Sequence, residues 1–249
     1  MRLGSFPAVS RREYDAGRSY QALWERWRTA PKAPLHITGM LVSGFIPGAD
    51  DAVHLDGILS AAVFGCSKVG AKVDPSESFV LPLPVDLHWV DDGGRPLWLT
   101  TDFRAADPQQ GTAYIHSRYP DHRADLANKQ SVLTSAGRFK DTRMPLRIIT
   151  AGLIGAWCIG DVDEIRSLLA ATTHVGRKPA HGQGRVVKWE VSAAPGIDAA
   201  WILERRMTPV AALGATAIIA DRIAPRGGWT PPYWDARFHT TCRRPKWTS

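Results

Sequence analysis

Apolar residues in the first part of the chain follow helix and strand periods. They recur at i, i+3, i+4, i+7 and i+8 in residues 55–64, which predicts an amphipathic helix there. A similar stripe predicts a helix within residues 10–30 and consists of Tyr20, Leu23, Trp24 and Trp27. Residues 35–42 have the length and apolar character of a strand, and residues 44–51 have the Gly, Pro and Asp content of a turn. The predicted order is helix, strand, loop and helix.

The middle of the chain begins with a hairpin and then loses its periodicity. Residues 79–90 and 97–103 are apolar runs typical of strands, and the Asp-Asp-Gly-Gly sequence at 91–94 is a strong hairpin signal between them. From residue 104 to 145 no regular period persists, and basic residues mix with glycine, proline and single aromatics. We expect a long basic insertion here, because long irregular segments in compact domains usually have a function of their own.

Regular periods return in the second half. Residues 146–159 predict one long strand. A helix is predicted to begin after Asp161, which is followed by a glutamate in the pattern of a capping box, and its apolar face ends at Leu169. A glycine-rich and cation-rich loop at 174–184 then leads into an alternating strand at 185–191.

The strand-helix-strand order therefore occurs twice, with the insertion between the two halves. A doubled β-α-β arrangement predicts an α+β fold of the ferredoxin-like sandwich type. We expect residues 1–34 to be an N-terminal helical extension and residues 35–220 to be the sandwich, with its insertion at about 104–145. Residues 221–249 are rich in Pro, Arg and Trp and are expected to form a C-terminal wrapping tail.

Charge is sorted along the chain. The 249 residues carry 31 Lys and Arg against 24 Asp and Glu, a net charge of +7. Residues 1–32 carry 7 basic and 3 acidic groups, net +4; residues 33–117 carry 4 and 10, net −6; and residues 118–249 carry 20 and 11, net +9. Clustered positive charge attracts polyanions such as nucleic acid. The sequence therefore predicts one positive face, formed largely by the second half.

Several classes of protein do not fit the sequence. The longest apolar run, at 210–220, is too short to cross a bilayer, and the N-terminal arginines are not followed by the apolar stretch of a secretory signal. Cys66, Cys158 and Cys242 are isolated and odd in number, which gives neither a disulfide framework nor a zinc pattern. We expect a reducing compartment, most simply a cytoplasm, with no membrane contact, no metal and no cofactor.

The most informative segment is residues 173–191, which runs from the second helix into the last strand. Glycines let a backbone approach a ligand and expose N–H groups to an anion, and arginine grips phosphate with two hydrogen bonds. A P-loop is excluded because Gly182 is followed by Gln183, and the dinucleotide fingerprint is excluded because Val187 stands where its third glycine would be. A contact that follows the phosphates of a longer polyanion fits better than a mononucleotide site.

The run Val175-Gly-Arg-Lys-Pro-Ala-His-Gly-Gln-Gly-Arg-Val-Val-Lys-Trp-Glu-Val191 resembles the glycine-rich loop of the CRISPR-associated RAMP superfamily, whose members have ferredoxin-like, RNA-recognition-type folds. More narrowly, the chain looks like the type IV effector subunits that bind the 5′ handle of the guide RNA (crRNA). Three further segments agree with this resemblance: Val53-His-Leu-Asp-Gly57, Gly137-Arg-Phe-Lys140 and Pro231-Pro-Tyr-Trp234.

The resemblance implies a non-catalytic crRNA-binding subunit of a type IV CRISPR effector complex in a prokaryotic cytoplasm. Such a subunit caps the 5′ handle and contacts backbone-filament and large-subunit-like proteins, and contact with target DNA through the complex stays open. A thumb-like hairpin within the insertion would separate handle from spacer. The expected RNA-binding residues are Gly176, Arg177, Lys178, His181, Gly182, Gln183, Gly184, Arg185 and Lys188, with Arg138 and Lys140 in the insertion.

Other interpretations stay open at this point. His174 and His181 would be the acid and base of a metal-independent endoribonuclease that trims precursor crRNA, if both reach a scissile phosphate. The chain would alternatively be a scaffold without RNA contact. The tail aromatics Trp229, Tyr233 and Trp234 either stack on RNA or pack the tail on the core. The stripe of Tyr20, Leu23, Trp24 and Trp27 packs inside the domain or against a partner, His54 is expected to support a turn, and Asp56 is expected to cap the first helix.

Overall fold

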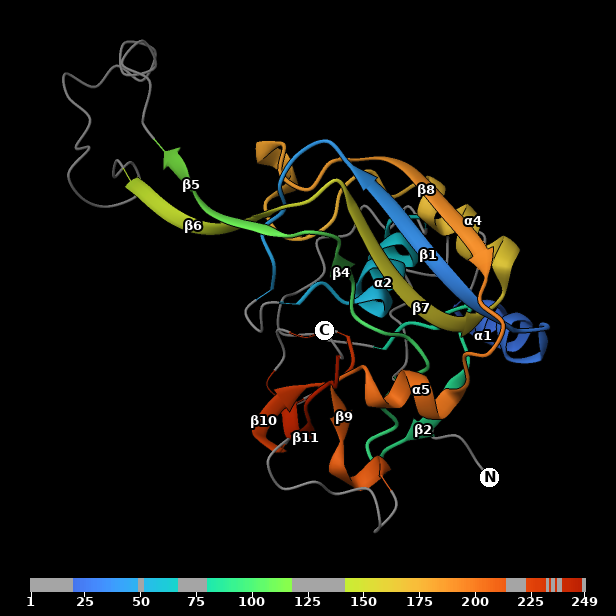
Figure 1. Ribbon diagram of the computed structural model, residues 1–249. Coiled ribbons are helices and arrows are strands. Elements are labelled where there is room, and N and C mark those ends of the chain that lie inside the picture. The colour runs from blue at the N-terminus through green and yellow to red at the C-terminus, as the bar shows by residue number, and fades with distance from the viewer. Residues whose placement is uncertain are drawn as a thin grey trace, which may run out of the picture.

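A four-stranded antiparallel sheet forms the centre of the protein (Figure 1). The computed structural model describes residues 20–48, 52–66, 80–117, 142–213, 223–231, 233, 236 and 239–247. The strands of the sheet lie side by side in the order β4 (Arg104–Ala105), β7 (Leu153–Gly160), β1 (Ala33–Leu41) and β8 (Val186–Ala193). Helices α2 (Leu55–Cys66) and α4 (Val162–Ala170) cover one face of this sheet (Figure 1).

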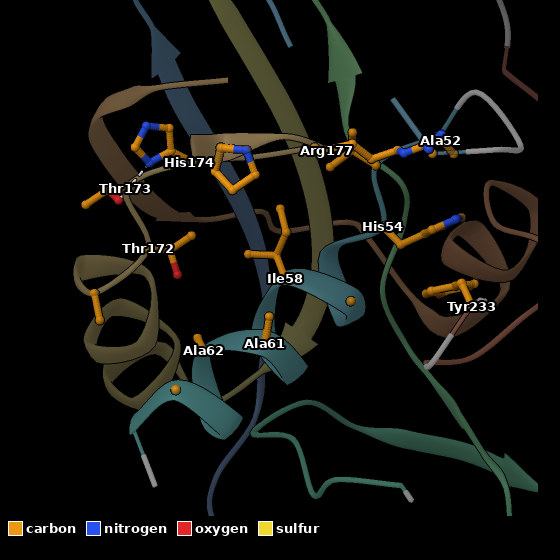
Figure 2. Close-up of a pocket in the computed structure, with 17 residues that line it drawn as sticks. Ala52, His54, Ile58, Ala61, Ala62, Thr172, Thr173, His174, Arg177 and Tyr233 are labelled. Carbon is orange, nitrogen blue, oxygen red and sulfur yellow. Dashed lines mark hydrogen bonds between the residues drawn. The ribbon is translucent and has the colours of Figure 1, made fainter. Parts of the chain in front are cut away.

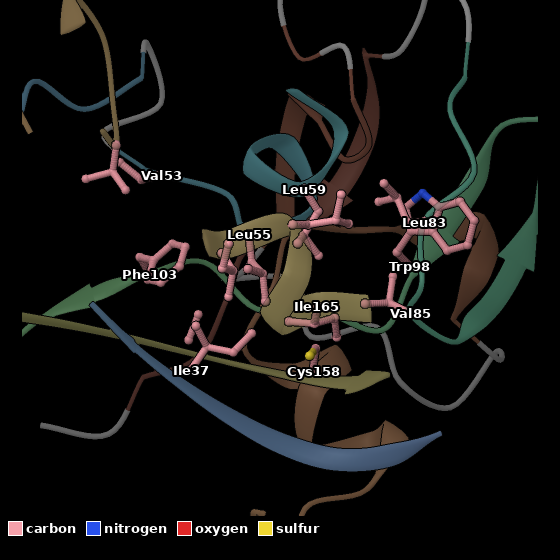
Figure 3. Packing of buried hydrophobic residues seen from close by; sticks show 14 of the residues in the cluster. Ile37, Val53, Leu55, Leu59, Leu83, Val85, Trp98, Phe103, Cys158 and Ile165 are labelled. Carbon is pink, nitrogen blue, oxygen red and sulfur yellow. The ribbon is translucent and has the colours of Figure 1, made fainter. Parts of the chain in front are cut away.

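Alternation along β1 explains why one face of the sheet is buried. Leu35, Ile37 and Leu41 point to the helices and are at most 6% exposed, whereas Met40 on the other face is 45% exposed. Figure 3 shows Ile37 and Cys158 of the sheet meeting Leu55 of α2 and Ile165 of α4. Period-two strands and period-3.6 helices thus bring their apolar sides into one core, as their sequences predicted.

The helix and strand predictions of highest periodicity are confirmed. The strand predicted at 35–42 is β1, the helix predicted at 55–64 is α2, and the final strand is β8. Helix α4 begins as expected, because Asp161 Oδ1 accepts hydrogen bonds from the backbone N–H groups of Asp163 (3.0 Å) and Glu164 (3.1 Å).

The apolar stripe near the N-terminus packs inside the domain at Leu23, Trp24 and Trp27. It lies on α1 (Tyr20–Thr29), where Trp24 and Trp27 are 7% and 3% exposed. Trp24 meets Trp98 edge to face, with ring centroids 5.9 Å apart. The ion pair between Arg26 and Glu164 ties α1 to α4. The residues before Tyr20 lie outside the described part of the chain.

The first hairpin is present, but its strands are shorter than predicted. Strand β2 (Leu87–Val90) pairs with β3 (Pro96–Trp98), and Asp91 accepts hydrogen bonds from backbone N–H groups across the turn between them. The prediction that residues 79–90 form one strand is wrong, because Pro82 and Pro84 have no N–H to donate to a ladder. Within residues 80–86, the described part of this range before Leu87, only Val85 is paired, in an isolated bridge.

The stretch from 104 to 159 differs most from the prediction. The expected irregular segment contains β4, then β5 (Gln109–Ser117), which pairs along its whole length with β6 (Thr142–Thr150). The predicted single strand at 146–159 is therefore divided: β6 belongs to the hairpin, and β7 joins the central sheet after a break at Gly152. The β5–β6 hairpin projects away from the body of the protein (Figure 1), and residues 118–141 at its end lie outside the described part of the chain.

The C-terminal segment forms a small second layer below the central sheet. Its elements are α5 (Ala199–Glu204), β9 (Thr208–Pro209), the 3₁₀ turn η4 (Val210–Ala212), β10 (Ile223–Gly228) and β11 (His239–Arg243). The three strands pair in the order β10-β11-β9. Trp229, Leu97 and Cys242 form a second core there. No helix in the described ranges is long and apolar enough to cross a membrane.

The sheet face opposite the two helices carries an aromatic cluster. His36 of β1 stacks on Trp157 of β7 at a centroid distance of 4.7 Å. Trp157 also contacts Trp201 of α5 and Trp247, at 5.4 and 5.9 Å. The C-terminal segment is therefore packed onto part of this face by tryptophans.

Candidate functional site

The glycine-rich loop, residues 171–185, is held by a short connector that follows β1. We call residues 42–46 the connector. Gly184 N–H donates to Gly44 O and Arg177 N–H donates to Ile46 O, each at 2.8 Å. Ser43 Oγ donates to Gly182 O (2.9 Å). The first residues of the segment expected to be only a turn at 44–51 therefore support the loop, and residues 49–51 lie outside the described part of the chain.

Two of the loop glycines are required by this packing. Gly184 has φ = +71° and a Cβ on it would lie 1.9 Å from Val175 O, while a Cβ on Gly176 (φ = +74°) would lie 2.4 Å from Ile46 O. Both close approaches are to the chain itself. Gly182 also has a positive φ, but a Cβ there would meet nothing within 4 Å. The loop amides of Val175, Arg177, His181, Gly182 and Gly184 donate to backbone oxygens, so these five are not available as an anion nest.

The four cations predicted to bind RNA in this segment are all exposed. Three lie on the loop, and the fourth, Lys188, lies on a strand of the central sheet. Arg177, Lys178 and Arg185 all lie on the loop itself, and Lys178 has a left-handed backbone with φ = +63°. Lys188 lies on β8 beside Met40, on the sheet face opposite the helices, and its Nζ is 2.6 Å from Glu190 Oε1. This hydrogen bond lowers the pKa of the Glu190 carboxyl. Gln183 and His181 remain on the loop, half-buried and exposed respectively.

A pocket of about 700 Å³ opens between α2 and the glycine-rich loop (Figure 2). Ile58, Ala61 and Ala62 of α2 form one wall, and His174 with two threonines forms another. Arg177 extends toward Ala52 at one side of the pocket, and His54 and Tyr233 close one end (Figure 2). The pocket therefore unites residues from three distant parts of the sequence.

A buried polar network supports the closed end of the pocket. His54 Nδ1 lies 2.6 Å from Asp102 Oδ1, and its ring stacks on Tyr233 at a centroid distance of 3.8 Å. Tyr233 donates its hydroxyl hydrogen bond to Asp56 Oδ1 (2.6 Å), and Arg206 Nη2 donates to Asp56 Oδ2 (3.2 Å). Burial, reinforced by the Asp56 carboxylate, raises the pKa of the Tyr233 phenol well above its usual value, so Tyr233 stays a neutral donor.

This network corrects the sequence assignments for two residues. Asp56 lies in the first turn of α2 and is 1% exposed, so it forms a buried ion pair with Arg206 rather than a surface cap. His54 bridges to Asp102 and lines the pocket rather than merely supporting a turn. No local pattern could have indicated either partner, because Arg206 follows Asp56 by 150 positions and Asp102 follows His54 by 48.

The two histidines proposed as acid and base lie in different settings. His174 lines the pocket, and its Nδ1 lies 2.9 Å from Thr173 Oγ1. His181 is exposed in the 3₁₀ turn η3 (Pro179–His181) and does not line the pocket. Within the described residues there is no cluster of three His, Cys, Asp or Glu that could hold a metal ion.

The tail aromatics that the structure describes pack on the protein. Trp229 is 1% exposed in the second core, and Tyr233 is held by Asp56 and His54. Trp234 lies outside the described residues, as do the insertion cations Arg138 and Lys140. Of the two alternatives, stacking on RNA or packing of the tail on the core, the structure shows packing for Trp229 and Tyr233.

The connector also holds the base of the β5–β6 hairpin. Phe45 exchanges two backbone hydrogen bonds with Ile149 of β6, at 2.8 and 2.9 Å. The hairpin carries exposed Arg143 and Arg147, and the Arg143 guanidinium lies 4.0 Å from the centre of the Tyr114 ring. One five-residue segment thus joins the basic loop to the basic hairpin.

Comparison with known proteins places the chain in a family. The family model of the CRISPR type IV associated protein Csf3 matches residues 100–244. This range is more than half of the chain and includes the hairpin, the glycine-rich loop and Tyr233. The chain therefore belongs to the Csf3 family of CRISPR type IV associated proteins, and the resemblance to a type IV CRISPR protein stated from the sequence is confirmed.

The remaining comparisons are more distant. No curated protein matches the chain. A solved chain from the cryo-EM structure of the type III-B Cmr-beta bound to cognate target RNA is similar at 12% identity and a TM-score of 0.35. That similarity covers 70% of this chain, which spans 65% of the other chain's length.

Proposed function

We propose that the chain is a non-catalytic subunit of a type IV CRISPR effector ribonucleoprotein, binds the 5′ handle of crRNA and contacts the backbone filament in a prokaryotic cytoplasm. Membership of the Csf3 family supports the CRISPR assignment. The observation that carries RNA binding is the connector, because it joins the cations of the loop, Arg177, Lys178 and Arg185, to the hairpin cations Arg143 and Arg147. All five side chains are exposed, as phosphate-binding groups must be.

The order of the elements supports a ferredoxin-like fold of the RAMP type. The first and third strands of the doubled β-α-β unit, β1 and β7, are central, and the partner strands β8 and β4 lie at the edges. The helix of each half, α2 or α4, packs on the same face. This leaves the glycine-rich loop at an end of the sheet, next to α2.

The projecting hairpin is the candidate for the thumb that separates handle from spacer. It has nine residues in each strand, and most side chains of β6 are exposed. Arg138 and Lys140 follow β5 in the sequence and stay proposed RNA contacts. Neighbouring copies of the backbone subunit and a large-subunit-like protein are the proposed protein partners, and target DNA would be met through the complex.

The salt dependence of RNA binding tests the proposal. The full chain is titrated into a labelled single-stranded CRISPR repeat RNA at several salt concentrations. Each phosphate contact contributes about 0.7 to the slope of log affinity against log salt, so Arg177→Ala with Lys178→Ala should reduce the slope by about 1.4. The matched control removes two exposed cations elsewhere, Arg28→Ala and Arg166→Ala, and should leave the slope unchanged. Absence of salt-dependent RNA affinity would favour a scaffold without RNA contact.

The alternative of an endoribonuclease has one supporting observation, the position of His174 in the pocket wall. Incubation of the chain with labelled repeat RNA in EDTA distinguishes the two functions. The proposal expects intact RNA. Cleavage that is lost on His174→Ala or His181→Ala would replace the non-catalytic assignment with a nuclease.

A further inference from the structure

The pocket beside α2 has a charge and a shape that phosphate contacts by the glycine-rich loop would not explain. Its volume of about 700 Å³ lies in the range of sites that enclose small organic groups. None of the described residues that line it is acidic, and Arg177 is the only lining Lys or Arg. An anionic ligand in the pocket would direct its charge to Arg177 and its apolar part inward.

The walls of the pocket suit a flat aromatic group with a polar edge. Ile58, Ala61 and Ala62 present short apolar side chains along one side of α2 (Figure 2). Thr172 and His174 face them from the other wall; Thr172 Oγ1 donates to Leu168 O (3.1 Å) and keeps its capacity to accept, and His174 Nδ1 lies 2.9 Å from Thr173 Oγ1, which leaves Nε2. An aromatic side chain of a peptide would supply the flat group but no anion for Arg177. A nucleotide supplies both, because it joins a flat base to a phosphate.

The closed end of the pocket is held in place by a buried polar network. The His54–Tyr233 stack is fixed from behind by Asp102 and by the Asp56–Arg206 ion pair. Asp56 is paired with the Arg206 guanidinium and Asp102 lies behind the His54 ring, and neither carboxylate lines the pocket. Preorganised aromatic surfaces hold unstacked bases in single-stranded RNA.

We propose that this pocket takes one unpaired nucleobase of the bound RNA strand, with an adjacent phosphate on Arg177. The inference rests on the proposed RNA-binding function and adds to it one defined base subsite. The strand would follow the cations of the loop and turn a single base between α2 and the loop, where Thr172 and His174 contact its edge.

A scan with abasic RNA tests the subsite. The full chain is titrated into the labelled repeat RNA and into a set of RNAs that each lack one base but keep every phosphate. Loss of a base held on an aromatic surface costs affinity by about 5- to 150-fold, so one position should stand out by this factor. An equal effect at every position would overturn the proposal.

Filling the pocket gives the complementary measurement. Ala61 is exposed and lines the pocket, so Ala61→Trp places a ring in the space without opening the core. This variant should lose the same factor with intact RNA, should no longer distinguish the sensitive abasic RNA, and should keep its salt slope. Ala22→Trp, on the exposed side of α1, is the matched control and should behave as the unchanged chain.

The outcomes separate the two proposals. Salt-dependent binding with an unaffected Ala61→Trp variant removes the pocket and leaves RNA binding in place. Absence of salt-dependent RNA binding removes both. Displacement of the strand by an equal concentration of nucleoside monophosphate would identify a mononucleotide site and overturn the inference.

Discussion

Replacement of Arg206 should cost more stability than replacement of any exposed arginine. The side chain is 3% exposed, and its guanidinium donates to Asp56 Oδ2 (3.2 Å), Thr100 Oγ1 (3.2 Å), Trp229 O (2.6 Å) and the carbonyl of Trp98. Arg206→Met keeps most of the side-chain length but leaves the Asp56 carboxylate, 1% exposed, without a cation. Removing one partner of a buried pair costs about 3–5 kcal/mol.

Urea unfolding of the purified chain measures this cost. With a slope of about 2.5–3 kcal/mol per molar urea for a protein of this size, the midpoint should fall by about 1–2 M. Asp56→Asn removes the other charge, and the double variant should lose clearly less than the sum of the two single losses, because neither ion is then left alone. Arg28→Met breaks an exposed pair with Glu25 and should cost less than about 1 kcal/mol. Additive losses, or a loss at Arg206 no larger than at Arg28, would falsify the assignment of a coupled buried pair.

Two further predictions concern the loop and the sheet. Gly184→Ala should lower the thermal midpoint more than Gly182→Ala, because both positions have positive φ but only at 184 would the Cβ meet a backbone oxygen; equal shifts would contradict the close packing of loop on connector. Burial lowers the pKa of His36 below its usual 6.5, so the unfolded chain takes up this proton first and stability should decline as pH falls through about 6.5. His36→Phe retains the ring against Trp157 and should make the decline of the urea midpoint between about pH 7.5 and 5.5 shallower, although His88, whose pKa burial also lowers, keeps part of it; an unchanged decline would assign the pH dependence to other groups.

The elements that could be predicted are those whose sequence pattern is set by one buried face. Strand β1 and helices α2 and α4 each show a regular apolar period, since each packs one side on the core. The β5–β6 hairpin has no buried face along most of its length, so its strands lack the alternation by which strands are recognised. Because β6 lacks this alternation, the sequence pattern did not mark where β6 ends and β7 begins, and one strand was predicted at 146–159. Only β7 alternates between buried and half-buried residues.

The sequence could predict the glycine-rich loop of the candidate site, but not the pocket beside it or the buried network that supports the pocket. Glycines and cations clustered in one short segment locate the loop, because those residue types act locally. The wall formed by Ala61, the end formed by Tyr233 and the support from Arg206 come from positions far apart in the chain. Only the fold brings them together, so neither the pocket nor its buried ion pair has a signature in the local sequence.

The attachment of the hairpin determines where its far end can reach. Nine residues at about 3.4 Å each make the described ribbon about 30 Å long, so a tilt of about 10° at its base displaces the far end by about 5 Å. The base is fixed by Phe45 and by Ile148, whose side chain fills the space beside Gly44 so closely that a Cβ there would lie 2.7 Å from it. The connector is thus the point about which the hairpin would tilt. A methyl group at position 44 would meet the Ile148 side chain at the base of the hairpin, and any tilt that this contact caused there would be enlarged at the far end.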